Sequence, residues 1–270
     1  MALTREAGAM ANERGEGVSA LELADVTVMA GRARLIEDVT LAIRPGVLTA
    51  ILGANGAGKS TALGVLAGDM RPARGEALLD GRPVGAFTPG ALAERRAVVL
   101  QHAPMNFSLR VHEVVALSRT SRPNGANVQA AIDERSLRCL GLMPLANRDY
   151  ATLSGGERQR VQIARALAQL WHHAEPGRAG YLLMDEPTAY LDLKHQIVAL
   201  EAAHAFAEAG GATLCILHDI GLAREFAGHV VLMRGGRIQA QGKPETLLTA
   251  SIIADIYGIS NRRAQRFSMA

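Results

Sequence analysis

The segment LTAILGANGAGKST, residues 48–61, joins an apolar strand-like run to a glycine-rich loop, and the helical pattern TALGVLAG follows it. Glycines permit the tight backbone path that turns successive N–H groups inward, and the start of a helix adds positive partial charge. Lys59 would reach the β and γ phosphates of a nucleotide, and the Ser60 hydroxyl would ligate Mg²⁺. The alternative is a glycine-rich turn without a ligand, which the strand before the loop and the helix after it disfavour. The predicted phosphate-binding residues are Gly53, Ala54, Asn55, Gly56, Ala57, Gly58, Lys59, Ser60 and Thr61.

Two further apolar runs end in polar residues, as strands buried on both faces do when they deliver functional groups to one edge of a sheet. YLLMDEP, residues 181–187, places Asp185 where it would hold Mg²⁺, and Glu186 where a carboxylate would orient or deprotonate the attacking water. These acids could instead merely cap the next helix. TLCILHD, residues 213–219, ends at His218, which would contact the γ phosphate; alone it would be an ordinary strand-end histidine.

The segment LSGGERQRVQIARAL, residues 153–167, begins a predicted helix with two glycines, which weaken helices. Ser154 and Glu157 have the spacing of a capping box, so the helix would start with exposed N–H groups. Gly155 and Gly156 would let an anion approach the backbone where the helix dipole is positive. The segment predicts a second phosphate-binding end, used by a nucleotide held between two copies of the chain. An ordinary capping box with incidental glycines is the alternative.

The alternation of strand-like and helical runs predicts an α/β fold with a largely parallel sheet and an antiparallel portion. The strand-like runs are ALELADVTV, LTAILG, EALLDG, AVVLQ, YLLMDE, TLCILHD and HVVLMRGGRIQAQG. Between about residues 105 and 149, the patterns VHEVVALSR and VQAAIDERSLRCLGLM indicate an inserted helical lobe. Residues 1–19 are expected to form a disordered tail.

Composition excludes several classes of protein. The 29 basic and 26 acidic side chains leave a formal charge of +3, too small to indicate nucleic acid as the main partner. Cys139 and Cys215 have no metal-ligand spacing and are expected to be reduced. No apolar run is long enough to span a bilayer, and the N-terminus lacks a secretion signal, which predicts a cytoplasmic protein. His172 and His173 begin the polar run WHHAEPGRAG, where we expect solvated side chains and no haem ligands.

The ordered set GANGAGKST, Gln101, LSGGERQR, YLLMDEP, AYLD and His218 resembles the nucleotide-binding subunit of ATP-binding cassette (ABC) transporters. That resemblance implies a P-loop NTPase fold, with a RecA-like core (residues 20–101 and 159–270), an antiparallel β part and a helical subdomain (about 102–158). It also implies ATP hydrolysis with Mg²⁺ by a homodimer. Lys59, Glu186 and His218 would be catalytic, and Ser60, Gln101 and Asp185 would surround the metal.

The same resemblance gives roles to residues outside the phosphate loop. Gln101 would begin the loop that senses Mg²⁺ and the permease. The segment 154–157 would bind the γ phosphate of the other subunit, and Asp192 would belong to the dimer-contact loop. Where the family usually has an aromatic residue for adenine stacking, this chain has Ala30, which leaves the adenine contact undefined. The run of residues 171–180 is longer than usual.

Among the cassette subfamilies, the chain is most similar to ATPase subunits of bacterial importers for haem, iron chelates and cobalamin, and to the haem (hemin) type most closely. Such a subunit would lie on the cytoplasmic face of the inner membrane, bind a polytopic permease, and act indirectly with a periplasmic substrate-binding protein. The alternatives are an importer ATPase for siderophores or cobalamin, a soluble cassette ATPase of DNA repair or translation, and a non-catalytic regulatory subunit. Long coiled coils, zinc motifs and fused cassettes are not evident in the sequence, which disfavours the soluble class.

Overall fold

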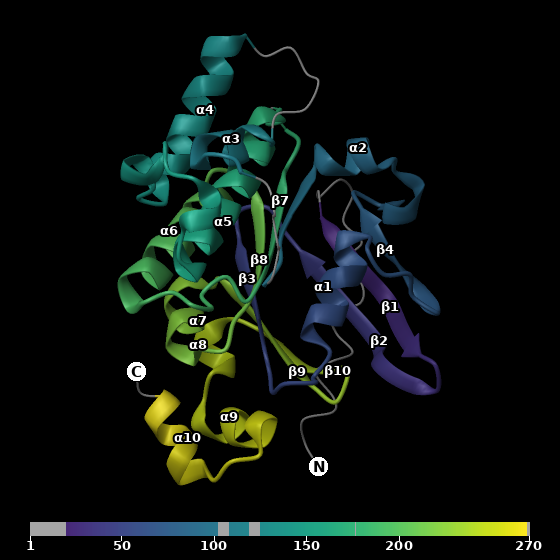
Figure 1. Cartoon of the computed structure of the whole chain (residues 1–270). Coiled ribbons are helices and arrows are strands. Elements are labelled where there is room, and N and C mark those ends of the chain that lie inside the picture. Colours follow the sequence, from purple (N-terminus) through teal and green to yellow (C-terminus); the bar gives the residue numbers. More distant parts are fainter. Residues whose placement is uncertain (1–19, 102–107, 119–124, 176, 269–270) are drawn as a thin grey trace.

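A six-stranded sheet forms the centre of the computed structural model, which describes residues 20–101, 108–118, 125–175 and 177–268 (Figure 1). Its strand order is β10-β9-β3-β8-β7-β6, and all neighbours are parallel except the β10–β9 pair. The strands are β3 (Leu48–Leu52), β6 (Arg96–Val99), β7 (Tyr181–Asp185), β8 (Ala212–Ile216), β9 (His229–Arg234) and β10 (Arg237–Gly242). Every residue of β3 and β8 is buried, which explains why each sequence is apolar except for one threonine.

A second, antiparallel sheet has the order β2-β1-β4-β5. Its strands are β1 (Leu21–Ala30), β2 (Ala33–Ile43), β4 (Arg74–Leu79) and β5 (Arg82–Pro83). Helix α1 (Lys59–Ala67) lies between this sheet and the central one, and its apolar side chains join residues of both sheets in one hydrophobic cluster (Figure 1). The phosphate loop at the start of α1 is therefore held between two sheets.

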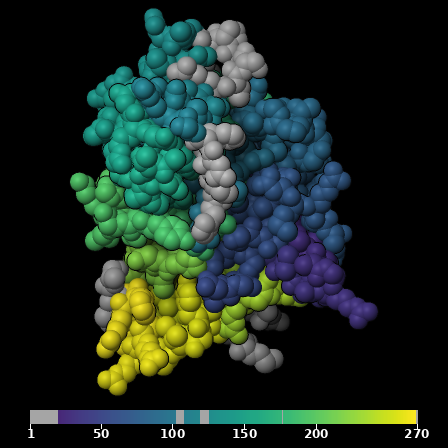
Figure 2. Space-filling view, in the orientation of Figure 1, coloured from purple at the N-terminus to yellow at the C-terminus, as the bar shows by residue number. Residues whose placement is uncertain are grey.

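The other face of the central sheet is covered by helices. Helices α3 (Val111–Ala116), α4 (Ala126–Cys139) and α5 (Gly155–His172) pack together, and α5 also contacts β6 and β7. The remaining helices are α2 (Pro89–Ala93), α6 (Leu193–Glu208), α7 (Ile220–Phe226), α8 (Pro244–Leu247), α9 (Ala250–Tyr257) and α10 (Asn261–Ser268). In the space-filling view the helical region around α4 and the C-terminal helices lie at opposite ends of the molecule (Figure 2).

The predicted α/β fold is confirmed, with both a parallel and an antiparallel sheet. Strand β2 was not among the strand-like runs. Its buried residues alternate at Val39, Leu41 and Ile43, but the phase changes before them at Asp38, which has a φ of 48°. That irregularity hides the two-residue period from which strands are recognised.

The expectation of solvated histidines in a polar loop was wrong. Helix α5 extends to His172, and both His172 and His173 are only 6% exposed. His172 Nε2 lies 3.1 Å from Asp133 Oδ1 of α4, so the two helices bury this polar pair between them.

The division into a RecA-like core and a helical subdomain stays a prediction, and α5 crosses the predicted boundary at residues 158 and 159 without a break. The predicted tail of residues 1–19 and parts of the helical lobe lie outside the described residues. Within the described residues, no helix combines the length and apolar character needed to cross a membrane. Cys139 and Cys215 are both free thiols.

Candidate functional site: a nucleotide phosphate cradle and a second anion-binding helix end

The phosphate loop connects the buried strand β3 to α1 through backbone positions that only glycine tolerates. Gly58 is the N-cap of α1 and has a φ of 95°. A Cβ added at Gly53, whose φ is 151°, would lie 2.1 Å from the carbonyl oxygen of Met233. The left-handed geometry at Gly58 and the close approach at Gly53 shape the loop into a concave backbone surface at a helix N-terminus, the geometry that binds phosphate.

Lys59 is 6% exposed, and its ammonium group lies over the loop. Its Nζ donates hydrogen bonds to the carbonyl oxygens of Gly53, at 2.9 Å, and Ala54, at 3.1 Å. Burial lowers the pKa of Lys59, while the nearby charges of Glu186 and Asp185 oppose that shift. A phosphate anion placed in the loop would therefore gain a cation that is already positioned and desolvated.

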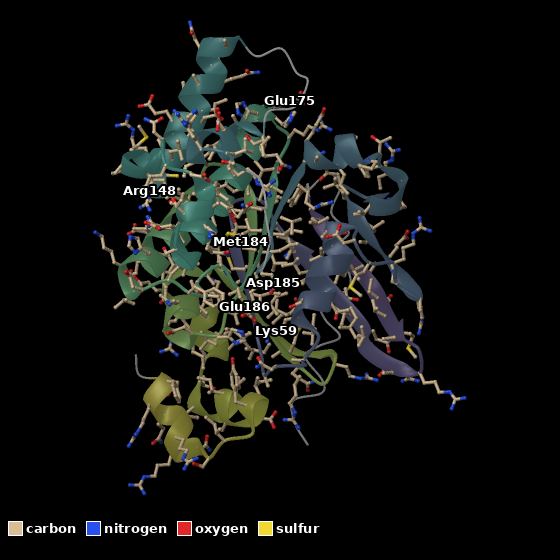
Figure 3. All side chains as sticks on the ribbon, viewed as in Figure 1. Lys59, Arg148, Glu175, Met184, Asp185 and Glu186 are labelled. Atoms are coloured by element: carbon tan, nitrogen blue, oxygen red, sulfur yellow. The ribbon has the colours of Figure 1, made fainter. Side chains whose placement is uncertain are left out.

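The acid at the end of β7 meets the helix that follows the loop. The Ser60 hydroxyl donates a hydrogen bond of 3.2 Å to Asp185 Oδ1, across 125 residues of sequence. Burial raises the pKa of Asp185, and the hydrogen bond from Ser60 opposes that shift. Lys59, Asp185 and Glu186 lie close together where α1 begins and β7 ends, whereas Glu175, which precedes β7, lies far from them (Figure 3).

These groups fit Mg²⁺, because this ion prefers oxygen ligands and is usually held by one or two carboxylates together with substrate phosphates and water. Ser60 and Asp185 supply a hydroxyl and a carboxylate oxygen within 3.2 Å of each other. Among the described residues, no group of three or more His, Cys, Asp or Glu side chains is arranged to hold a metal ion by itself. These residues therefore suit a Mg²⁺ ion that is also coordinated by a bound phosphate.

Glu186 stands at the centre of a hydrogen-bonded triad. Gln101 Nε2 donates to Glu186 Oε2 at 2.8 Å, and His218 Nε2 lies 2.6 Å from Glu186 Oε1. The backbone of Glu186 has a φ of 50°, a left-handed geometry that costs free energy in a non-glycine residue. The end of β6, the end of β7 and the end of β8 thus converge on one carboxylate. The structure brings together the sequence-predicted residues of this part of the site.

The second predicted anion site lies at the start of α5, where Ser154 and Glu157 form the predicted capping box. The Glu157 N–H donates to Ser154 Oγ at 3.2 Å, and the Ser154 N–H donates to Glu157 Oε2 at 2.7 Å. That backbone hydrogen bond lowers the pKa of Glu157 and keeps it ionised. Because the Ser154 hydroxyl accepts in this pair, its own O–H is left to serve as a donor.

A hollow of about 380 Å³ opens at this helix end. It is lined by Ser154, Gly155, Gly156, Glu157, Arg160, Tyr190, Leu191, Asp192 and His195. Asp192 caps α6 by accepting a hydrogen bond of 2.9 Å from the His195 N–H. No residue of the phosphate loop lines the hollow. Within one chain, the capped helix end therefore meets the loop around Asp192 rather than the phosphate cradle.

The two glycines of this helix end differ in their surroundings. A Cβ at Gly156 would lie 2.7 Å from the Tyr190 carbonyl oxygen, whereas a Cβ at Gly155 would meet nothing closer than the Tyr190 Cβ at 3.8 Å. Gly156 is thus required by a contact within the chain, whereas a Cβ at Gly155 would make only an ordinary van der Waals contact. Tyr190, with a φ of 63° and 66% exposure, was not singled out from the sequence. Tyrosine rarely adopts this left-handed backbone conformation, so the sequence did not indicate it.

The parallel sheet, the phosphate loop and the strand-end acids define a P-loop nucleoside triphosphatase. A family model described as ABC transporter matches residues 36–189, more than half of the chain. The chain belongs to the ABC transporter family, as an ATPase subunit, and the resemblance on which the sequence prediction rests is confirmed.

Two curated relatives illustrate the similarity. A hemin import ATP-binding protein of Rhodopseudomonas palustris is 43% identical over 228 residues, which cover 84% of both chains. The protein of the same name from Bradyrhizobium diazoefficiens is 44% identical over 243 residues, which cover 88% of both chains.

Solved structures share the fold. The ATP-binding subunit of an ABC transporter superposes with a TM-score of 0.75 at 23% identity, covering 93% of this chain and all of the other. A Clostridium perfringens protein, cbiO1, described as part of the ABC transporter complex cbiONQ, superposes with a TM-score of 0.73 at 25% identity, covering 94% of this chain and 98% of the other.

Proposed function

We propose that this chain is the ATP-hydrolysing subunit of a bacterial import system for hemin. Two copies would close around two ATP molecules and drive conformational change in a membrane permease. The observation that carries the proposal is the open helix end at Ser154 and Gly155, which presents anion-binding groups that no phosphate loop of the same chain faces. The names of the relatives, hemin import ATP-binding proteins, support the cargo.

The chemistry at the cradle follows from the positions of the side chains. Loop N–H groups and Lys59 would hold the β and γ phosphates, and Ser60 with Asp185 would hold Mg²⁺. When bound, Mg²⁺ supplies neutralisation of charge that develops on the phosphate oxygens. Glu186 would orient or deprotonate the attacking water, while Gln101 and His218 position its carboxylate. His218, whose side chain is 46% exposed, would also reach the γ phosphate.

The missing half of each site would come from the second copy. In a head-to-tail pair, the Ser154 hydroxyl and the N–H groups at Gly155 and Gly156 of one copy would face the γ phosphate bound by the other. Asp192 and the residues around it would then lie at the contact between the copies. Closure would therefore depend on ATP, because the γ phosphate is the group that both copies bind.

The assembly would lie at the cytoplasmic face of the inner membrane, bound to a polytopic permease and working with a periplasmic hemin-binding protein. The test is growth of the source bacterium with hemin as its only iron source. Deletion of the gene should abolish that growth, and the wild-type gene, but not one carrying Glu186→Gln, should restore it. Growth on free iron salts should not change.

The same strains distinguish the alternatives. If the deletion strain still uses hemin but no longer grows on an iron–siderophore complex, the cargo is a siderophore. If it loses cobalamin-dependent growth instead, the cargo is cobalamin. Increased sensitivity to DNA damage or a defect in translation, with all three uptake functions intact, would contradict the importer function itself.

A further inference from the structure

One wall of the phosphate cradle is built from the β1–β2 hairpin and the turn between β9 and β10. The Gly236 N–H donates to the Ala57 carbonyl at 3.1 Å, and the Glu37 N–H donates to the Gly236 carbonyl at 2.8 Å. A Cβ at Gly58 would lie 2.9 Å from the carbonyl oxygen of Leu35. Backbone hydrogen bonds and close packing therefore fix this part of β2 directly beside the loop.

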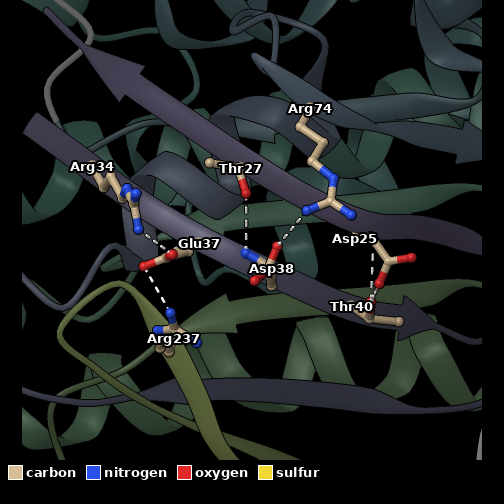
Figure 4. Close-up of polar contacts among 8 residues, drawn as sticks. All are labelled: Asp25, Thr27, Arg34, Glu37, Asp38, Thr40, Arg74 and Arg237. Carbon is tan, nitrogen blue, oxygen red and sulfur yellow. Dashed lines mark hydrogen bonds and ion pairs between the residues drawn. The ribbon is translucent and has the colours of Figure 1, made fainter. Parts of the chain in front are cut away.

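Two arginines on this wall share one carboxylate (Figure 4). Arg34, on β2, and Arg237, on β10, both form ion pairs with Glu37, the latter at 2.9 Å. The Glu37 side chain is 22% exposed, whereas Arg34 and Arg237 are 61% and 52% exposed. Two guanidinium groups and one carboxylate leave one net positive charge, and the exposed fractions leave guanidinium surface open to a ligand.

The nucleoside of a bound nucleotide has to leave the cradle on this side. Gln101 and His218 both contact Glu186 at the ends of β6, β7 and β8, and the proposed nucleotide site places the terminal phosphate there. A polyphosphate that starts there and runs along the loop brings its other end toward the residues packed on Ala57 and Gly58. The hairpin from Met29 to Leu35 offers no aromatic side chain to the base.

We propose that Arg34 is the platform on which the nucleotide base stacks, and that Glu37 is the residue that positions it. A guanidinium is planar and cationic, and it stacks on aromatic rings in a way that an ammonium does not. The ion pair with Glu37 restricts the long Arg34 side chain before the nucleotide binds, which lowers the entropy cost of stacking. Arg237 also pairs with Glu37 and shares its negative charge, so Arg34 is not the only partner of this carboxylate.

This inference rests on the proposed nucleotide site, and its test separates the base from the phosphates. The affinities of ADP and pyrophosphate are measured by calorimetry for the wild type and for Arg34→Ala. ADP carries the base and pyrophosphate does not, and neither is hydrolysed by an ATPase. We expect Arg34→Ala to weaken ADP roughly 3-fold to 30-fold and to leave the affinity of pyrophosphate unchanged.

Three further variants separate stacking from charge. Arg34→Lys keeps the positive charge but not the plane, and it should bind ADP as weakly as Arg34→Ala. Arg34→Tyr restores a planar ring, and it should recover most of the affinity. Arg74→Ala is the matched control, because Arg74 is an exposed arginine of the same sheet that pairs with Asp38 at 3.5 Å (Figure 4). It should bind ADP like the wild type.

The possible outcomes are distinct. Equal losses for ADP and pyrophosphate in Arg34→Ala, full affinity for ADP in Arg34→Lys, or unchanged affinity for ADP in Arg34→Ala would each overturn the platform. A wild-type protein that binds neither ADP nor pyrophosphate would contradict the proposed nucleotide site instead. Thermal unfolding of each variant confirms that a loss of affinity does not come from a loss of fold.

Discussion

The phosphate loop and the start of α5 are both glycine-rich helix N-termini, yet the chain surrounds them differently. The loop is enclosed by its own chain: Lys59 lies over it, Asp185 meets Ser60, and β2 and the β9–β10 turn pack behind it. The start of α5 opens into a hollow bordered by Tyr190 and Asp192. The phosphate loop has a lysine and two carboxylates of its own chain beside it, whereas the start of α5 presents its backbone N–H groups and the Ser154 hydroxyl to a hollow that no residue of the phosphate loop lines.

The difference indicates which site acts alone. A buried cation is expensive unless charges surround it, and Asp185 and Glu186 provide them for Lys59. The helix end at Gly155 needs no such compensation, because it is exposed and its dipole is only a partial charge. The enclosed site is therefore suited to bind a nucleotide within one chain, and the open end is suited to complete a site on another chain.

The largest expected effect comes from the carboxylate of the enclosed site. Glu186→Gln keeps the shape of the side chain but removes the base, and the turnover of ATP should fall by about 10²–10⁴-fold. Binding of ATP should persist, because the loop and Lys59 are untouched. The trapped nucleotide should hold two copies together, so size-exclusion chromatography with ATP should show a dimer. Rapid release of phosphate by this variant in a single-turnover assay would contradict the role of Glu186.

A mixing experiment tests whether the two anion sites belong to different chains. Lys59→Ala disables the enclosed site. Gly155→Asp places a carboxylate at the open helix end, where it favours the helix dipole but repels phosphate. Each variant alone should lose at least about 100-fold in turnover, the order seen when one charge-stabilising group is removed from a catalytic site.

Mixed together, these two variants should recover activity in proportion to the heterodimers formed. Each heterodimer contains one site built from an intact loop and an intact helix end. The control is that each variant still forms dimers with the wild-type chain. If the mixture nevertheless stays inactive, both anion sites work within one chain. ADP affinity of Gly155→Asp, measured separately, should equal that of the wild type.

Local sequence predicted the enclosed site well, because its residues follow one another along the chain or end buried strands. Gly53 and Lys59 were placed by the glycine-rich loop between a strand and a helix, and Asp185 and His218 by apolar runs that end in polar residues. The structure brings these residues to one edge of the sheet. The roles of these residues stay predictions. The parallel sheet itself was predictable for the same reason, since its strands are buried on both faces.

Contacts between distant segments were not predictable. Position 156 has to be glycine because a Cβ there would collide with the carbonyl oxygen of Tyr190, which belongs to a distant turn. The burial of His172 depends on how far α5 extends and on what α4 presents to it. The sequences of α4 and α5 do not show that these helices pack together. The polar composition of residues 171–180 therefore indicated a solvated loop. Tertiary packing overrides local composition at such places.

The two glycines at the start of α5 sharpen the comparison within a single motif. The Gly155→Ala side chain would make only an ordinary contact with Tyr190, so this variant should stabilise the isolated helix by up to about 1 kcal/mol, yet it should slow hydrolysis by obstructing the partner's phosphate. Gly156→Ala places a Cβ 2.7 Å from the Tyr190 carbonyl, so it should destabilise the fold by about 1–3 kcal/mol. Chemical denaturation and steady-state ATPase assays on both variants separate the two effects. Equal stabilities would show that the Tyr190 loop moves away without cost.

The smallest expected effect on turnover concerns the far end of α5, where Asp133 pairs with His172. Asp133→Ala would leave the buried His172 imidazole without this carboxylate and should cost about 1–3 kcal/mol of unfolding free energy. Glu134→Ala is the matched control, since Glu134 is the next residue of α4 but is 51% exposed in its ion pair with Arg138. That variant should change stability by less than about 1 kcal/mol.

Because α5 begins at the open anion site, Asp133→Ala should reduce the turnover of the dimer while the ADP affinity of the enclosed loop stays unchanged. If Asp133→Ala and Glu134→Ala unfold at the same denaturant concentration, the buried pair does not anchor α5, and its packing on α3, α4 and the central sheet is sufficient to hold it.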